Sequence, residues 1–287
     1  LNRGVMIQPQ NKCYNSDCDR FDYHLHTGCS ADGSGTVKDY CREAVRKGFI
    51  EICITNHQEW ISAANGYYDY AMRNTNWHKL LRDIEAARQD FPELSVKLGC
   101  EIGYYPQYAT EIIQFTKELP FDYVISSVHA LENKTLSDVK ISGSKDKNVQ
   151  IKWIRRYYSS ILEMVQHDYF DCVGHFDVAK RHIPFQALEA CQDLINDIAK
   201  SMIKYDIGFE LNTSHWFLAN QECYPGLEIL QVFKDVGIKK VTIGSDAHSP
   251  ENLGQGILKG LEILKKAGFA SLCTFSKRIP TYHTLTP

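Results

Sequence analysis

The chain has 287 residues, of which 44% are hydrophobic and 23% are charged, and its formal net charge is −3. This length and composition suit one α/β barrel domain spanning 1–287, with residues 1–19 as an N-terminal extension. The small negative charge gives no general attraction to nucleic acid or to an anionic membrane. No apolar run approaches the roughly 18 residues that span a bilayer, and the N-terminus lacks a signal-peptide pattern.

Ten cysteines occur singly, without any CxxC pair. Cys53, Cys100 and Cys172 lie inside apolar, strand-like runs, where a thiol behaves as a small hydrophobic group. A framework of disulfides is typical of short secreted chains rather than of a chain of this length. We therefore expect reduced thiols and a cytoplasmic location.

Short runs rich in Val, Ile, Phe and Tyr predict seven strands, near 20–24, 50–55, 95–100, 122–128, 171–174, 207–211 and 240–245. Apolar residues at helical spacing predict helices over 36–48, 76–89, 185–205 and 253–268. This alternation implies a parallel sheet, and closure into a barrel would remove its edges. Residues 131–150 show neither pattern and predict a long irregular loop over the active face, either as a solvated surface loop or as a cover for the substrate.

Potential metal ligands recur where these strands end. His24 and His26 are two residues apart on a strand and therefore share a face, and Asp246 and His248 repeat that spacing. Asp22, two residues before His24, is expected to orient one of the rings as a hydrogen-bond acceptor. An isolated His-x-His pair is weak evidence for a metal, because core histidines bonded to carbonyl groups can show the same spacing, so the metal prediction depends on the recurrence.

Glu101 also ends a strand, in a position that would bury its carboxylate. Burying a carboxylate is costly unless it is paired or bound to a metal. Parallel strands in a barrel deliver their carboxyl ends to one shared face. We therefore predict one metal site from nine residues: His24, His26, Asp32, His57, Glu101, His129, His175, Asp246 and His248.

From about residue 20 to residue 260, this ordered set resembles the polymerase-and-histidinol-phosphatase (PHP) superfamily. The resemblance rests on His24-x-His26 with Asp32, Asn56-His57, Glu101, Ser127-x-His129, Gly174-His175 and Ser245-Asp-Ala-His248. It implies a distorted (β/α)7 TIM-like barrel with a trinuclear metal centre. One metal would be held by His24, His26, Glu101 and Asp246, and a second by Glu101, as a bridge, with His129 and His175. The third would be held by Asp32, His57 and His248.

Two stretches, Gly174-His-Phe-Asp177 and Glu210-Leu-Asn-Thr-Ser214, resemble the histidinol-phosphate phosphatase branch of that superfamily. The resemblance implies hydrolysis of L-histidinol phosphate in histidine biosynthesis. After Ser214 this chain has His215-Trp-Phe, where the branch has Gly-Leu and basic residues, so another small phosphomonoester remains an alternative substrate. A PHP phosphodiesterase or exonuclease is a further alternative, but it would need a basic track that this sequence lacks.

The chemistry expected of such a site is phosphoryl transfer to water. Two to three divalent ions of zinc, iron or manganese would lower the pKa of a bridging water from about 15.7 toward neutrality, and the hydroxide would attack phosphorus in line. Among the nine ligands, Glu101, Asp246 and His248 are assigned catalytic roles. The expected partner is a small phosphorylated substrate, with no nucleic acid and no membrane.

Substrate contacts are predicted from residues near the ligands. Arg181 is the first candidate for a phosphate clamp, because a guanidinium can bind two oxygens at once. Lys180, Arg155 and Arg156 are further candidates for the same role. Asn212 and His215 are expected to contact the substrate, and Tyr67 and Tyr68 to wall the pocket.

Overall fold

The computed structural model describes residues 17–30, 32–60, 75–131, 134–136, 144, 146–181, 187–214 and 222–285. Its centre is a sheet of seven parallel strands, with a short strand, β3 (His57–Gln58), also paired to β4. The seven strands are, in spatial order, β1 (Phe21–Asp22), β2 (Glu51–Ile54), β4 (Ser95–Gly103), β5 (Tyr123–Ser127), β8 (Cys172–Val173), β9 (Gly208–Asn212) and β10 (Val241–Gly244). Each lies where the sequence predicts a strand.

Backbone hydrogen bonds join the first strand to the last. The Tyr23 N–H donates to the Ile243 carbonyl at 2.9 Å, and the Ala247 carbonyl accepts from the His26 N–H at 2.9 Å. Leu25 and Ala247 also form a parallel bridge just beyond the two strand ends. The seven-stranded parallel sheet therefore curls back on itself as a TIM-like barrel, as predicted.

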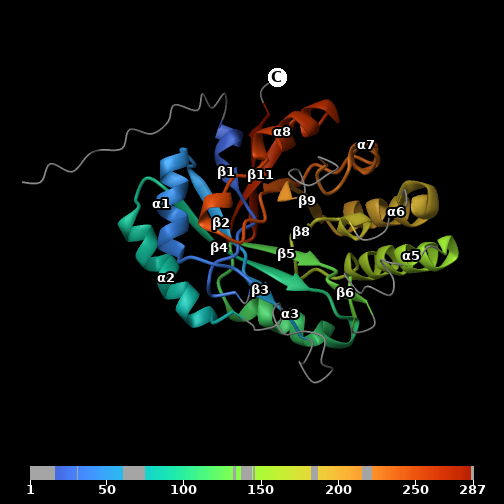
Figure 1. Ribbon diagram of the computed structural model, residues 1–287, viewed down its shortest axis with the longest axis horizontal. Coiled ribbons are helices and arrows are strands. Elements are labelled where there is room, and N and C mark those ends of the chain that lie inside the picture. The colour runs from blue at the N-terminus through green and yellow to red at the C-terminus, as the bar shows by residue number, and fades with distance from the viewer. Residues whose placement is uncertain are drawn as a thin grey trace, which may run out of the picture.

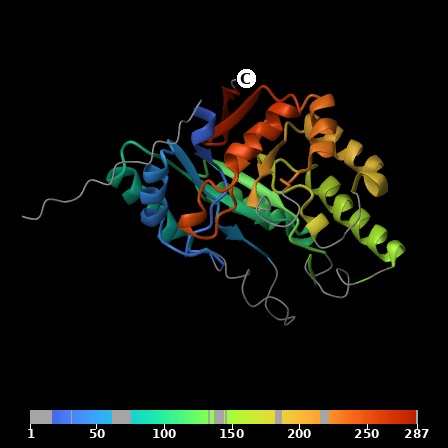
Figure 2. The same cartoon turned by 45° about the horizontal axis from the view of Figure 1, so that its top comes forward.

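Helices surround the sheet (Figures 1 and 2). They are α1 (Val37–Lys47), α2 (Trp77–Asp90), α3 (Ala109–Glu118), α5 (Lys147–Met164), α6 (Ala187–Lys204), α7 (Leu227–Asp235) and α8 (Ile257–Lys266). In Figure 1, α1 and α2 cover one flank of the sheet, and α5 and α6 lie together at the opposite end. The predictions for α1, α2 and α6 are confirmed to within about two residues, whereas α3, α5 and α7 were not predicted.

The last predicted helix, 253–268, begins later than its apolar spacing suggests. Residues Pro250–Asn252 form a 3-10 helix, η6, and α8 starts only at Ile257. Gly254 and Gly256 between them have φ of 74° and 79°, in the left-handed region that glycine tolerates and an α-helix does not use.

The prediction of an irregular loop over 131–150 is wrong for its last residues. Helix α5 begins at Lys147, and the Asp146 side chain caps it by accepting a hydrogen bond from the Asn148 N–H. Gln150 is the first of the buried residues of this helix, which continue with Trp153 and Ile154 at helical spacing. The helical pattern therefore already begins inside the predicted loop. Near the other end, β6 (Ala130–Leu131) and β7 (Lys134–Thr135) pair antiparallel.

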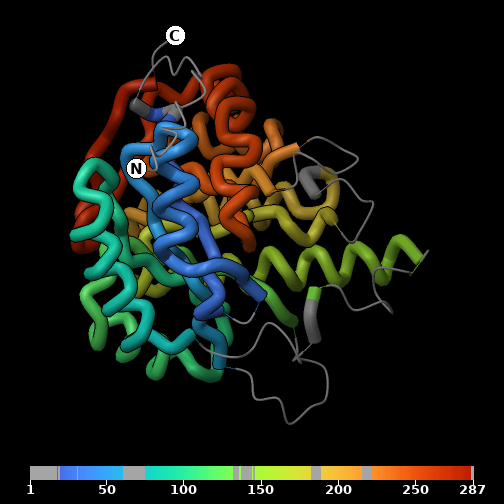
Figure 3. Tube along the Cα trace, turned by 60° about the vertical axis from the view of Figure 1, so that its left-hand side comes forward, coloured from blue at the N-terminus to red at the C-terminus, as the bar shows by residue number. Residues whose placement is uncertain are grey.

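A C-terminal hairpin closes the amino-terminal end of the barrel and was not predicted. Its strands are β11 (Ser271–Ser276) and β12 (Ile279–Thr284). The Phe275 ring lies 4.8 Å from Tyr123 and 6.5 Å from Tyr23, measured between centroids. The 3-10 helix η1 (Asp17–Arg20) lies against β12, so the two ends of the described chain adjoin (Figure 3).

Two further findings bear on the expectations from composition. The nine cysteines within the described ranges are all free thiols, eight of them buried, while Cys13 lies outside those ranges. Among the described helices, none combines the length and the apolar character needed to cross a membrane.

Candidate metal centre

Glu101 lies at the centre of the predicted cluster, near the carboxyl end of β4. Its side chain is 1% exposed. Oε1 lies 2.8 Å from His175 Nε2 and 3.1 Å from His129 Nε2, and it accepts a hydrogen bond from the Ser127 hydroxyl at 2.8 Å. Glu101, His129 and His175 therefore form a group of donor atoms able to hold a metal ion.

The other carboxylate oxygen of Glu101 faces the His-x-His pair. Oε2 is 3.2 Å from His24 Nε2 and 3.4 Å from His26 Nε2. Asp246 Oδ1 approaches the same two nitrogens at 3.5 and 3.3 Å. His24, His26 and Asp246 make a second group of donor atoms, and Glu101 lies between the two groups.

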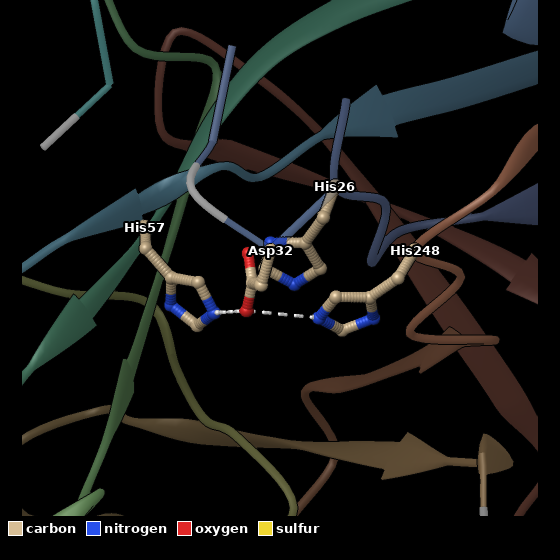
Figure 4. A group of neighbouring side chains, drawn as sticks. All are labelled: His26, Asp32, His57 and His248. Atoms are coloured by element: carbon tan, nitrogen blue, oxygen red, sulfur yellow. Dashed lines mark hydrogen bonds and ion pairs between the residues drawn. The ribbon is translucent and has the colours of Figure 1, made fainter. Parts of the chain in front are cut away.

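A third group is formed by His26, Asp32, His57 and His248 (Figure 4). One oxygen of Asp32 lies 3.1 Å from His57 Nε2 and 3.2 Å from His248 Nε2. The His26 ring stacks against both the His57 ring and the His248 ring, with centroids 4.4 and 4.3 Å away. The structure therefore brings together all nine residues selected from the sequence.

The spacing of these donor atoms fits divalent cations. Tetrahedral ligands held 2.0–2.1 Å from a zinc ion lie about 3.3 Å from one another. The carboxylate oxygens of Glu101 lie 2.8 Å from His175, 3.1 Å from His129 and 3.2 Å from His24. The Asp32 oxygen lies 3.1 Å from His57 and 3.2 Å from His248. Imidazole and carboxylate are ligands for zinc, iron and manganese.

The charges of the metal-free cluster are strongly coupled. Burial alone would raise the pKa of Glu101, but the charges of His24, His57 and His129 hold it well below its ordinary value. Burial lowers the pKa of His24, yet Glu210 and other carboxylates raise it well above 6.5. Glu101 is thus ionised and His24 carries a proton that offsets part of its charge, whereas burial and the charges of His248 and His57 lower the pKa of His26 from 6.5 to about 3.

Close backbone approaches make this packing possible. A Cβ at Gly244 would lie 2.4 Å from the Cβ of His24 and 2.5 Å from Glu210 Oε1, so glycine is required where β10 passes this pair. Asp246, two residues later, has φ of 54°, in the left-handed region that a non-glycine residue adopts only when its surroundings impose it.

Asp22 does not orient a histidine ring, contrary to the prediction. Its carboxylate is fully buried and accepts hydrogen bonds from the Ser245 N–H and hydroxyl, at 2.9 and 2.5 Å, and from the Gly254 N–H at 2.8 Å. Strand β1 turns the side chain of Asp22 toward the loop after β10, so it fixes the backbone next to Asp246 instead.

Glu210 orients the His24 ring and was missed as a site residue. Its Oε1 lies 2.6 Å from His24 Nδ1, while Oε2 accepts hydrogen bonds from the His175 N–H at 3.0 Å and the Asn212 amide at 3.2 Å. The available signal was a carboxylate inside the apolar strand run 207–211, the same signal that singled out Glu101.

Glu59 is the second residue that sequence reasoning missed. It lies two residues after His57 and forms a fourth group of donor atoms with His57 and His129. The two-residue spacing that identified His24 with His26, and Asp246 with His248, would have found it.

Two of the predicted substrate residues, Asn212 and Arg181, lie within the described chain. The Asn212 amide donates to Asp246 Oδ2 at 3.3 Å, and its oxygen accepts from the Ser214 hydroxyl at 2.7 Å. Arg181, at the end of the 3-10 helix η4 (Val178–Arg181), is exposed. Burial raises the pKa of the nearby Tyr224 hydroxyl; the positive charge of Arg181 opposes that rise, and the negative charge of Asp246 adds to it. His215, Tyr67 and Tyr68 lie outside the described residues.

Two of the other basic candidates are engaged elsewhere. Lys180 pairs with Asp177 at 2.9 Å and with Glu222 at 3.1 Å. Arg155 forms two hydrogen bonds to the Asp193 carboxylate, at 2.8 and 2.7 Å, between α5 and α6. Arg181 thus remains the first candidate for a phosphate contact.

Comparisons with known proteins show which sequences and structures this chain resembles. A histidinol-phosphatase of Lactococcus lactis subsp. lactis (strain IL1403) is 26% identical over 265 residues, covering 90% of this chain and 94% of the relative. A probable histidinol-phosphatase of Thermotoga maritima is also 26% identical, covering 91% and 97%. The crystal structure of the Lactococcus histidinol phosphate phosphatase, in complex with zinc, L-histidinol and phosphate, superposes with a TM-score of 0.80 over 92% of this chain and 99% of that one.

The putative histidinol phosphatase of Listeria monocytogenes shares the fold, with a TM-score of 0.71 at 17% identity, covering 83% of this chain and 99% of that one. The family model of the PHP domain matches residues 22–214, which include seven of the nine predicted ligands. The remaining two, Asp246 and His248, join them from the end of β10, where the barrel closes. This chain belongs to the PHP domain family.

Proposed function

We propose that this chain is a metal-dependent phosphomonoesterase that hydrolyses L-histidinol phosphate to L-histidinol and phosphate. The observation that carries the proposal is Glu101, a buried carboxylate with histidine nitrogens at 2.8 to 3.4 Å around both of its oxygens. The substrate follows from the Lactococcus relative, whose structure contains zinc, L-histidinol and phosphate and which this chain matches over nearly its whole length.

Two to three divalent ions of zinc, iron or manganese are proposed at the three groups of donor atoms. Glu101 would bridge two of them, one with His24, His26 and Asp246 and the other with His129 and His175. The third would be held by Asp32, His57 and His248, with His26 adjoining. Bound divalent cations supply positive charge for phosphate oxygens and make water acidic enough to ionise near neutral pH.

The chain's own residues position the reactants. Asn212 holds the Asp246 carboxylate in place through its amide. Arg181 is proposed to bind phosphate oxygens from the rim, where its guanidinium is exposed and no ion pair within the described chain occupies it. His215 is proposed as a substrate contact because it follows β9 directly after Ser214.

Substrate preference tests the assignment. Protein purified without chelator is compared on L-histidinol phosphate, p-nitrophenyl phosphate, a sugar phosphate and a short oligonucleotide. We expect kcat/KM for L-histidinol phosphate to exceed the others by about a hundredfold or more, because a site built to hydrogen-bond one substrate discriminates strongly against others that lack its groups. Equal values for L-histidinol phosphate and p-nitrophenyl phosphate contradict the substrate and leave the phosphatase chemistry standing.

A different small phosphomonoester is the second candidate. After Ser214 this chain has His215-Trp-Phe, whereas the histidinol-phosphate phosphatase branch that it resembles has Gly-Leu and basic residues there. A sugar phosphate turned over faster than L-histidinol phosphate would favour this candidate, and cleavage of the oligonucleotide would favour a phosphodiesterase.

A further inference from the structure

Glu59 lies just beyond β3 and is 4% exposed, yet it is not one of the nine predicted ligands. Its Oε1 is 2.7 Å from His129 Nδ1, and its Oε2 accepts a hydrogen bond from the Tyr105 hydroxyl at 2.6 Å. A carboxylate this deeply buried is costly unless its contacts compensate for the loss of water. The contacts with His129 and Tyr105 compensate Glu59 for that loss.

The end of β4 is shaped to seat this carboxylate. A Cβ at Gly103 would lie 1.8 Å from Glu59 Oε2, so the Glu59 side chain occupies the space that any other residue at position 103 would fill. Strand β4 thus carries Glu101 into the cluster and, two residues later, leaves room for Glu59 beside it.

The nitrogen atoms involved indicate whether Glu59 is a metal ligand or a hydrogen-bond acceptor. A neutral imidazole has one N–H and one nitrogen with a free lone pair. His129 directs Nε2 toward Glu101 Oε1 at 3.1 Å, in the group proposed to hold the second ion. If Nε2 gives its lone pair to that ion, Nδ1 carries the proton, and its 2.7 Å separation from Glu59 is a hydrogen bond.

His57 leads to the same conclusion. Its Nε2 lies 3.1 Å from Asp32, in the group proposed to hold the third ion, while its Nδ1 lies 3.1 Å from Glu101 Oε2 and 3.7 Å from Glu59 Oε1, too far for a hydrogen bond to Glu59. A fourth ion bound by Glu59 and both Nδ1 atoms would require both rings to lose both protons. Glu59 is thus left as the hydrogen-bond acceptor of His129.

We propose that Glu59 is a positioning residue that fixes the tautomer and orientation of His129, and so sets the affinity of the second metal site. The inference rests on the metal set of the proposed function. Carboxylates that hold the second nitrogen of a ligating histidine are typically worth about 10–100-fold in metal affinity. The same arrangement recurs in this centre, where Glu210 holds His24 Nδ1 at 2.6 Å.

Metal titration of four variants tests the proposal. Metal-free Glu59→Ala, Glu59→Gln, Tyr105→Phe and Gly103→Ala are titrated with zinc against a chromophoric chelator, with Glu118→Ala on exposed α3 as the control. We expect Glu59→Ala to bind one zinc equivalent about 10–100-fold more weakly and to keep the others. Glu59→Gln retains an acceptor oxygen and should lose less, and Tyr105→Phe should lose least.

Gly103→Ala provides an independent check because it removes no polar group. Its methyl group would displace the Glu59 carboxylate, so its zinc titration should resemble that of Glu59→Ala. The kcat of Glu59→Ala should recover at saturating zinc, since the residue acts on metal affinity and not on the reacting atoms. Substitution of cobalt for zinc should give an altered visible spectrum for the weakened equivalent only.

Three outcomes overturn the proposal. Unchanged zinc affinity in Glu59→Ala shows that the hydrogen bond to His129 does not set the site. Weakening of all equivalents together with a lower unfolding midpoint of the metal-free protein assigns Glu59 a purely structural role. A wild-type protein that binds no zinc contradicts the proposed function itself, and this result is distinct from the first two.

Discussion

Glu101 contacts more of the predicted ligands than any single-metal role requires, with His24, His57, His129 and His175 all at 2.8 to 3.2 Å from its two oxygens. We expect Glu101→Gln to lose on the order of a hundredfold or more in kcat/KM, because a neutral amide cannot bridge two cations. Mutation of residues that only hydrogen-bond the metal ligands already costs about 10–100-fold in metal affinity or activity. The measurement is kcat/KM alongside bound metal per chain.

The matched control for Glu101→Gln is Glu118→Gln, the same chemical change on an exposed helix. It should leave both turnover and metal content unchanged. Near-native turnover of a folded Glu101→Gln protein with full metal content would show that the bridging assignment is wrong.

Glu210 holds three groups at once: the His24 ring, the His175 N–H and the Asn212 amide. In Glu210→Gln the amide can present only one acceptor oxygen to these three donors, so one of them loses its partner. We expect about 10–100-fold weaker zinc binding, measured by competition with a chelator. Wild-type affinity in Glu210→Gln would mean that packing alone orients His24.

At the scale of elements, the C-terminal hairpin determines how the barrel is closed at its amino-terminal end. Phe275 is 1% exposed and packs against Tyr23 and Tyr123, while the Arg278 guanidinium on the hairpin turn pairs with Asp171 at 2.5 Å. The nine predicted metal ligands lie at the opposite ends of the strands. The hairpin is therefore expected to affect stability more than catalysis.

We expect Phe275→Ala to lower the free energy of unfolding by about 3–5 kcal/mol, as large-to-small changes of buried aromatic residues do. Urea denaturation of the metal-loaded protein measures this. The control is Ile279→Ala on β12, whose side chain is 69% exposed and whose loss should change little. Equal midpoints for the two variants would show that the Phe275 ring contributes no packing energy.

At the scale of the whole molecule, pH acts oppositely on the metal-free and metal-bound forms. Burial lowers the pKa of His248, but Asp32 and Asp246 outweigh it and raise the value from 6.5 to about 9. In the metal-free protein, the contacts of protonated His248 with Asp32 and Asp246 stabilise the fold. This contribution to stability is fully present below pH 6.5 and is lost as the pH rises to about 9. Metal binding needs the neutral ring, so it must release this proton at neutral pH.

We therefore expect zinc affinity to rise about tenfold per pH unit between pH 6.5 and 8 for each proton released. Calorimetry in two buffers of different ionisation enthalpy measures the number of protons directly. The urea midpoint of the metal-free protein should fall over the same range. Zinc affinity that is flat across this range would contradict the proton-coupled binding.

Much of this fold could be predicted because its signals are local. Each of the seven barrel strands is a short apolar run, and the capping box of α1, Thr36 with Asp39, forms as its sequence indicates. Helix α5 was missed although its buried residues, from Gln150 to Met164, follow helical spacing. The C-terminal hairpin was missed because its buried face is completed by distant segments. Phe275, for example, contacts Tyr23, which is 252 residues away along the chain.

The sequence by itself determined which nine residues cluster and that the strands form a barrel, because strand ends in a parallel barrel share one face and the two-residue spacing places side chains together. Only the tertiary structure decided which carboxylates orient the histidines. Asp22 is two residues from His24 but turns to Ser245, whereas Glu210 and Glu59 reach His24 and His129 from other strands. Hydrogen bonds across a barrel depend on the register and close approach of non-neighbouring strands, and no local pattern encodes those distances.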